Sequence, residues 1–183
     1  MALFEPYTPE VLRKLLPEQM LVRPAVEADL AGISLIHAQR YELDLEQAGE
    51  WAEKGWQRRG DNPWFVAVLG AQVVGYAHLL RFIPPPDAPP ECVPAGWYLM
   101  GLTVAAPWRR HGIGFALSQA RLEWLRDRCE NAWYFANSLN RTSIALHAQL
   151  GFTEARSGIW FPGVEFSGGG IGLLFRVELL KQG

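Results

Sequence analysis

Cysteine is scarce in this sequence, and long apolar runs do not occur in it. Only Cys92 and Cys129 of its 183 residues are cysteines, and they lack the spacing of metal ligands and are too few for a disulfide framework. No segment approaches the roughly 20 consecutive apolar residues that span a bilayer. We therefore expect a protein from a reducing compartment, without a metal and without a membrane-spanning helix.

Neither sign of charge is in excess. The chain has 17 basic and 19 acidic residues and a net charge of -2, which gives no indication of a nucleic-acid or membrane partner. Its first 20 residues contain Glu5, Glu10 and prolines instead of the basic start and apolar stretch of a secretory signal. We expect a cytoplasmic location and small or neutral partners, and a homodimer is one of the oligomeric states left open.

The composition that is present suits one globular domain. With 49% apolar and 12% aromatic residues, a chain of this length can bury a sizeable core. We expect a single domain over residues 1–183, with an N-terminal arm at 1–20 of helical character. Residues 83–94 contain six prolines, which favour an extended loop over a paired strand. This loop is either a surface connection or a flap over a binding site.

Apolar periodicity predicts alternating element types. Their order is strand, two helices, three strands, helix, strand, helix and two strands, which argues for an α/β fold with a mixed sheet flanked by helices. In the third predicted helix, Ile113, Leu117 and Trp124 repeat on one face. The charged residues of this helix, Arg121 among them, are expected mostly elsewhere, with the face away from the apolar residues solvated.

The stretch "WRRHGIGFAL" joins a predicted strand, "GWYLMGLTV", to that helix. The first amide N–H groups of a helix have no acceptor within it. They point out of its N-terminal end, which is also the positive end of the helix dipole. Gly112 and Gly114 lack side chains, so a diphosphate can approach the backbone, while Arg109 and Arg110 can add charge-assisted hydrogen bonds. The stretch predicts an anion site.

The two common nucleotide-binding fingerprints do not fit. Leu117 stands where a dinucleotide loop has its third glycine, and no Gly-Lys-Ser/Thr follows for a P-loop. Taken alone, the two glycines would be explained equally well by a structural turn. The remaining motifs decide between these interpretations.

Three motifs together resemble the GNAT superfamily of acyl-CoA-dependent N-acyltransferases. "LTVAAPWRRHGIGFAL" matches the family's Arg/Gln-x-x-Gly-x-Gly/Ala loop, although its Val-to-Pro spacing is one residue longer than the commonest form. "NRTSIALHAQLGF" is similar to the family's Asn-x-x-Ala-Ile-x-Leu-Tyr-x-x-x-Gly-Phe helix, and "VRPAVEADLAGI" to its first strand and helix. The resemblance covers residues 21–179 and implies a mostly antiparallel sheet of about seven strands.

The resemblance also implies acetyl-CoA as acyl donor, used without a metal. Asn140 is expected to contact CoA, whereas hydrogen bonding within the protein is the simpler explanation for Ser143. The predicted donor-binding residues are Leu102, Thr103, Val104, Arg109, Arg110, His111, Gly112, Ile113, Gly114, Phe115, Asn140 and Ser143.

His147 stands where the family has its tyrosine, which gives a proton to the departing thiolate. An imidazole N–H can do the same, so we predict His147 as the catalytic acid. The rival is a core histidine, with the proton supplied by water or another group such as Tyr98 or Tyr76. The predicted strand before the loop has no carboxylate or histidine; His78 and Glu91 lie elsewhere and are not assigned as base.

The resulting hypothesis is transfer of an acetyl group to a primary amine of a small molecule or peptide, directly within a ternary complex. The rival hypothesis is a non-catalytic acyl-CoA-binding module or sensor. By resemblance, the acceptor region combines acidic and aromatic residues, which suits a cationic amine. These residues are Glu42, Asp44, Glu46, Glu50, Trp51, Trp56, Pro84 to Pro94, Trp160 and Phe161.

Overall fold

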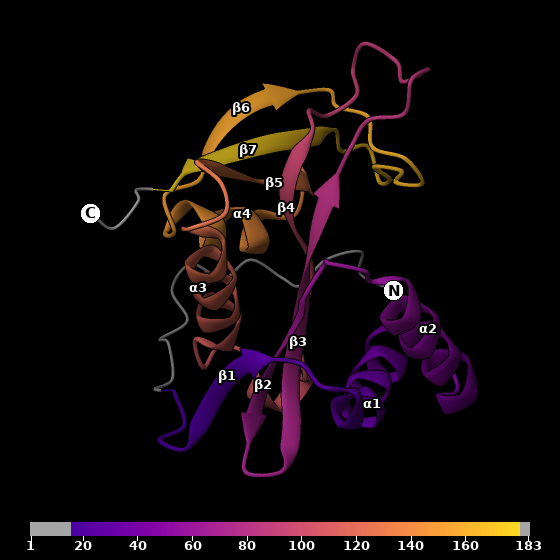
Figure 1. The fold of residues 1–183 in the computed structure, drawn as a ribbon, viewed down its shortest axis with the longest axis vertical. Helices are drawn as coiled ribbons and strands as arrows, with labels where there is room; N and C mark the ends of the chain where they lie inside the picture. Colours follow the sequence, from indigo (N-terminus) through magenta and orange to yellow (C-terminus); the bar gives the residue numbers. More distant parts are fainter. Residues whose placement is uncertain (1–15, 180–183) are drawn as a thin grey trace. The chain divides into compact units, whose positions relative to one another are not determined.

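A computed structural model describes residues 16–179, so residues 1–15 of the predicted N-terminal arm lie outside the described range (Figure 1). The described chain divides into two compact units. Residues 16–80 and 99–123 form what we call the N-terminal unit, and residues 81–98 and 124–179 form the C-terminal unit. The expectation of a single domain stays a prediction.

The order of helices and strands is the one that the sequence predicted. In the N-terminal unit, α1 and α2 precede a hairpin of β2 and β3. Its elements are β1 (Met20–Pro24), α1 (Leu30–Tyr41), α2 (Leu45–Arg58), β2 (Trp64–Leu69), most of β3 (Gln72–Phe82), the second part of β4 (Gly96–Val104) and most of α3 (Ile113–Leu125).

The C-terminal unit is built on three antiparallel strands and one helix. Its elements are β5 (Asn131–Asn137), α4 (Arg141–Ala148), β6 (Thr153–Ser157) and β7 (Gly172–Glu178), with the ends of β3, β4 and α3. The seven strands run in the order β1-β2-β3-β4-β5-β7-β6, and β4 pairs with β5 in parallel. The other strand pairs whose direction is defined, β1 with β2, β2 with β3, and both pairs of β7, are antiparallel, so the predicted mixed sheet is confirmed.

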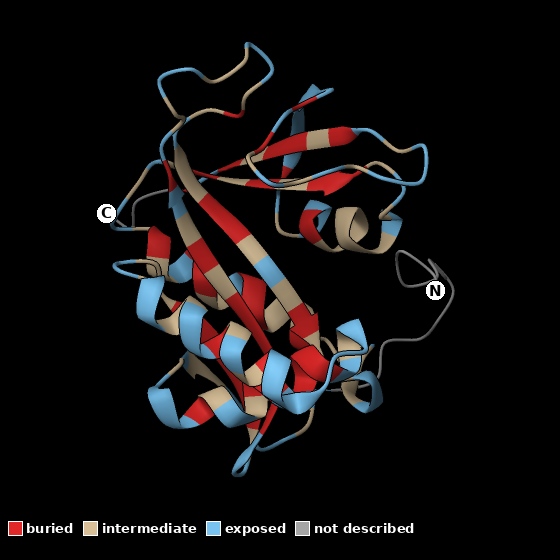
Figure 2. Cartoon of the chain, turned by 90° about the vertical axis from the view of Figure 1, so that its right-hand side faces the viewer, coloured by how far each residue is buried: buried red, intermediate tan, exposed pale blue. Residues whose placement is uncertain are grey.

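The core of the N-terminal unit has a layer on each face of its strands. On one face, Ile33 and Ile36 of α1 pack against Val66 of β2 and Tyr76 of β3, all buried. On the other face, Leu117 of α3 lies beside the backbone of β3. Figure 2 shows the burial along the strands and the exposed outer turns of the helices. The helices of the described residues are too short or too polar to cross a membrane.

The predicted exposure of Arg121 is wrong. Its side chain has 0% exposure, and its guanidinium donates to the carbonyls of His78 and Met100, at 3.1 and 3.0 Å, and to the Ser118 hydroxyl at 2.9 Å. Arg121 lies four residues after Leu117 and therefore on the same face of α3, so its charge, and not its spacing, led to the wrong expectation. Here, two strand carbonyls provide the acceptors that allow a charged group to be buried.

The proline-rich stretch is an irregular connection between β3 and β4, with no helix or strand at residues 83–95. Arg156 of β6 holds it by donating to the backbone carbonyls of Glu91 and Cys92. The backbone of Cys92 also forms an isolated parallel β-bridge with the backbone of Trp160. The C-terminal unit therefore anchors the second half of this loop.

Two helical glycines differ in the space around them, and this predicts opposite effects of one substitution. A Cβ at Gly32 of α1 would lie 2.7 Å from the Cβ of Val73, whereas a Cβ at Gly49 of α2 would meet nothing within 4 Å. We expect Gly32→Ala to lower the free energy of unfolding by about 1–3 kcal/mol through overpacking. Gly49→Ala should raise it by about 0.5–1 kcal/mol, because alanine favours the helix.

Urea denaturation of the two variants beside the unsubstituted protein measures both effects. A Gly32→Ala protein as stable as the parent would contradict the close packing of α1 on β3.

Candidate functional site

β4 departs from regular extended structure at Gly101, whose φ is +60°. A left-handed glycine inside a strand is typical of a bulge, where the backbone is redirected. The carbonyl of Met100, immediately before it, accepts from Arg121. β4 is thus irregular just before Leu102, the first of the predicted donor-binding residues.

The loop after β4 has the geometry of an anion site. The sign of φ alternates along it. Arg110 and Gly112 have positive φ, +66° and +80°, whereas the φ of His111 between them is not positive. Alternation of this kind turns successive backbone N–H groups toward one point. The first helical bond runs from Ala116 N–H to Gly112 C=O, so the amides of Ile113 and Gly114 precede the helical ladder.

The side chains of this loop are held from within it. Arg109 Nε donates to the Val104 carbonyl at 3.2 Å, and His111 Nδ1 donates to the Arg109 carbonyl at 2.9 Å. Arg110 is exposed. The structure therefore brings together the predicted residues from Leu102 to Phe115 along one continuous segment of the N-terminal unit.

Thr103 faces a buried polar group instead of solvent. It is 7% exposed and hydrogen-bonds the Tyr76 hydroxyl, which also lies 2.8 Å from His37 Nδ1. Burial raises the pKa of Tyr76 and lowers that of His37. Tyr76 and Thr103 are thus committed to an internal network, and only the backbone of Thr103 is left to meet a ligand.

His78 of β3 lies directly against the bulge. A Cβ at Gly101 would lie 2.5 Å from its Cε1 and 2.6 Å from its Nδ1, and the ring stacks on Trp64 at 5.5 Å. Nδ1 is buried and has no hydrogen-bond partner among residues 16–179, although the side chain is partly exposed. Burial, with the nearby Arg121 charge, lowers the pKa of His78 to about 4, so the imidazole is neutral at pH 7.

The predicted residues of α4 belong to the C-terminal unit, not to the unit of the loop. Asn140 is the N-cap of α4 and accepts from Ser143 N–H, while the Ser143 hydroxyl accepts from Tyr134. His147 is 2% exposed, stacks on Tyr134 at 3.7 Å and packs edge-on against Phe152. Each of these polar groups therefore has a structural role.

The hydrogen bond of His147 defines its tautomer. Nδ1 lies 2.9 Å from the Ser143 carbonyl, which can only accept, so Nδ1 carries a proton. Of the other predicted acids, Tyr98 is 0% exposed and donates to the Pro94 carbonyl at 2.6 Å. The hydroxyls of both phenols named from the sequence, Tyr98 and Tyr76, have hydrogen-bond partners within the protein.

Several residues predicted for the acceptor region have structural roles. Asp44 caps α2 by accepting from Gln47 N–H, and Glu50 forms an ion pair with Lys54. Trp51 stacks on His37 with ring centroids 3.4 Å apart. The acidic and aromatic character of α2 is therefore largely explained by helix stability and packing.

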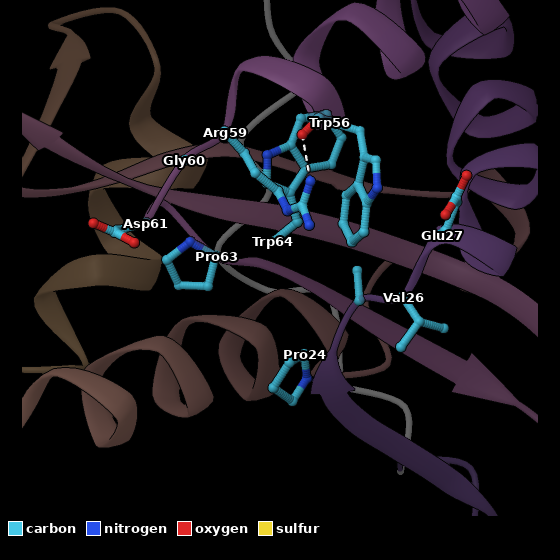
Figure 3. Close-up of a pocket in the computed structure, with 10 residues that line it drawn as sticks. Pro24, Val26, Glu27, Trp56, Arg59, Gly60, Asp61, Pro63 and Trp64 are labelled. Carbon is cyan, nitrogen blue, oxygen red and sulfur yellow. Dashed lines mark hydrogen bonds between the residues drawn. The ribbon is translucent and has the colours of Figure 1, made fainter.

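Trp56, also predicted for the acceptor region, lines an open cavity of about 480 Å³ in the N-terminal unit (Figure 3). The Arg59 guanidinium lies over the Trp56 ring at 3.5 Å and donates to the Trp56 carbonyl, and Trp64 lies edge-on to Trp56. Glu27 and Asp61 lie at the rim. No cluster of metal-binding side chains occurs among residues 16–179.

The sequence matches the Acetyltransferase (GNAT) family over residues 30–152, which is more than half of the chain. The chain belongs to this family. As a GNAT acetyltransferase it is an acyl-CoA-dependent N-acyltransferase, and such enzymes use acetyl-CoA as donor. No curated protein matches the chain significantly.

Solved structures share the fold of this GNAT protein. A ribosomal-protein-alanine N-acetyltransferase from Brucella melitensis is 28% identical, with a TM-score of 0.64 over 87% of this chain and 99% of that chain. A phosphinothricin acetyltransferase from Sinorhizobium meliloti, solved with acetyl-CoA, is 21% identical, with a TM-score of 0.65 over 88% and 89%. A putative acetyltransferase from Salmonella typhimurium, also solved with acetyl-CoA, is 22% identical, with a TM-score of 0.64 over 90% and 96%.

The loop geometry predicts that Gly112→Val weakens acetyl-CoA binding. The valine side chain would oppose the left-handed backbone, and its Cβ would lie 3.4 Å from Leu16 Cγ, so we expect the loop and its amides to be displaced. Loss of one or two charge-assisted hydrogen bonds corresponds to about 10- to 100-fold in Kd.

Isothermal titration with acetyl-CoA measures this loss. Gly60→Val is the matched control, because Gly60 also has a positive φ, +52°, and a Cβ there would meet nothing within 4 Å. Unchanged affinity in a folded Gly112→Val protein would refute the assignment of the loop.

Proposed function

We propose that this protein transfers the acetyl group of acetyl-CoA to a primary amine of a small molecule or peptide, directly within a ternary complex. The observation that carries the proposal is the continuous segment from the bulge in β4 to the start of α3. Its amides can bind a diphosphate, and its irregular strand can offer an N–H to the thioester carbonyl. Both features belong to one compact unit.

The chemistry needs three proton movements. An alkyl ammonium, with a pKa of roughly 10.4, must lose a proton before its nitrogen attacks the thioester carbonyl carbon. After the attack the nitrogen loses a second proton, the C–S bond breaks, the amide forms and the thiolate takes up a proton to leave as CoA. An amide N–H of β4 stabilises the negative charge that develops on the carbonyl oxygen.

For the proton that goes to the thiolate, we propose His147. Because its Nδ1 proton is engaged by the Ser143 carbonyl, the proton must come from Nε2, which means that the imidazolium is the donor. The contacts with Tyr134 and Phe152 hold the ring in one orientation. The same contacts suit a core histidine, so the experiment must separate the two roles.

The neighbours support an amine acceptor without defining its size. One is named for an alanine of a ribosomal protein and another for phosphinothricin. The acceptor class proposed here is therefore the primary amine that both peptides and small molecules can provide.

Binding of the donor is the first test. Isothermal titration with acetyl-CoA, CoA and dephospho-CoA should give saturable binding, and a panel of amines should then release thiol from acetyl-CoA. The panel contains a short peptide with N-terminal alanine, spermidine and tyramine. If a folded sample binds none of the three nucleotides, the proposed function is wrong.

Substitution of His147 tests the proton donor. We expect His147→Phe, which preserves an aromatic ring against Tyr134, to lower kcat about 100-fold while the Kd for acetyl-CoA is unchanged. Phe175→Leu disturbs the packing around Tyr134 without removing the imidazole or its contacts with Tyr134 and Phe152, and should leave kcat near the parent value. Full activity of the His147→Phe enzyme would reassign His147 to the core.

A further inference from the structure

Arg121 is a buried cation without an acidic partner. Its side chain is fully buried, and no carboxylate among residues 16–179 bonds or pairs with it. Burial lowers the pKa of Arg121 to about 9, so it is still charged at neutral pH. An uncompensated buried charge is costly for stability. A fold that only needed to fill this space would be served by an apolar side chain.

The acceptors of this charge lie at the bulge. A single nitrogen, Nη1, donates to the His78 carbonyl of β3 and to the Met100 carbonyl of β4, which are neighbouring strands. The Met100 carbonyl therefore points toward the guanidinium that α3 provides. The peptide bonds between the described residues are trans, and in a trans peptide the C=O and the following N–H point in opposite directions. The Gly101 N–H consequently faces away from the guanidinium.

We propose that Arg121 is a positioning residue for acyl transfer: by binding the Met100 carbonyl, it orients and polarises the peptide before Gly101 so that β4 presents an amide to the thioester carbonyl. The inference rests on the proposed function. A cation on the carbonyl of a peptide strengthens the hydrogen bond that its N–H donates. The charge of Arg121 thus acts on the developing oxyanion through one peptide bond.

The opposite side of the bulge is held as well. The His78 ring lies so close to Gly101 that any side chain there would collide with it, and Trp64 fixes the ring by stacking. Arg121 also donates to its own helix, through Leu117 and Ser118. These contacts leave the Met100–Gly101 peptide little freedom to rotate.

The test measures the donor carbonyl itself. In the complex of the protein with acetyl-CoA labelled with ¹³C at the carbonyl, we expect the carbonyl resonance to move downfield from its free position. In Arg121→Met the carbonyl resonance should return most of the way to its free position. The Kd for acetyl-CoA should stay within about threefold of the parent value. With an amine from the panel, kcat should fall about 10-fold, less than for loss of a direct oxyanion donor.

Two further variants separate positioning from stability. Arg121→Lys keeps the charge but not the fork of donors, so its carbonyl shift and kcat should be intermediate. It also serves if Arg121→Met does not fold. Ile36→Ala removes core packing on α1 and destabilises the fold, yet it should leave both the carbonyl shift and kcat unchanged at temperatures where it is folded.

The outcomes distinguish the two proposals. Absence of acetyl-CoA binding by the parent protein overturns the proposed function, and this inference with it. Binding without a downfield shift in the parent overturns the inference alone. The inference is also overturned if folded Arg121→Met keeps both the carbonyl shift and the kcat of the parent protein. If Arg121→Met does not fold, the same result in Arg121→Lys overturns it.

Discussion

The buried guanidinium of Arg121 is the interaction on which the candidate site depends. It links α3 to β3 and β4 inside the N-terminal unit, where the bulge at Gly101 disturbs β4. Removing it would take a donor away from two partly buried carbonyls, and an unsatisfied buried polar group costs about 1–3 kcal/mol. The same contacts that hold the helix on the strands therefore also orient the backbone of β4.

The proposed donor site is made mainly of backbone. Gly101 lies within β4, and the residues from Arg110 to Gly112 lie between β4 and α3; both adopt conformations that turn amide groups out of regular structure. Backbone amides recognise a carbonyl or a phosphate whatever the rest of the ligand is. Acetyl-CoA binding can thus be built from one short segment, whereas acceptor choice requires side chains from elsewhere.

The sequence predicted what local patterns determine. Apolar periodicity identified the order of the elements, and Gly112 and Gly114, on either side of Ile113, indicated the turn at the start of α3. The burial of Arg121 could not be predicted, because the two carbonyls that allow a cation to be buried there lie 43 and 21 residues away in the chain. Asn140 has a local signal for its structural role, since asparagine before a helix is a preferred N-cap. Spacing alone could not place the His78 ring against Gly101.

The electrostatics of the N-terminal unit limit how the acceptor amine loses its proton. His78 is the titratable group beside the bulge, and with a pKa of about 4 it is too weak a base to take a proton from an alkyl ammonium of pKa roughly 10.4. The positive charge of Arg121 opposes its protonation further. In the proposed reaction, that charge would also disfavour an ammonium near the bulge, so the amine would have to be deprotonated before it reaches the thioester. The field that would favour the oxyanion would thus separate deprotonation from attack.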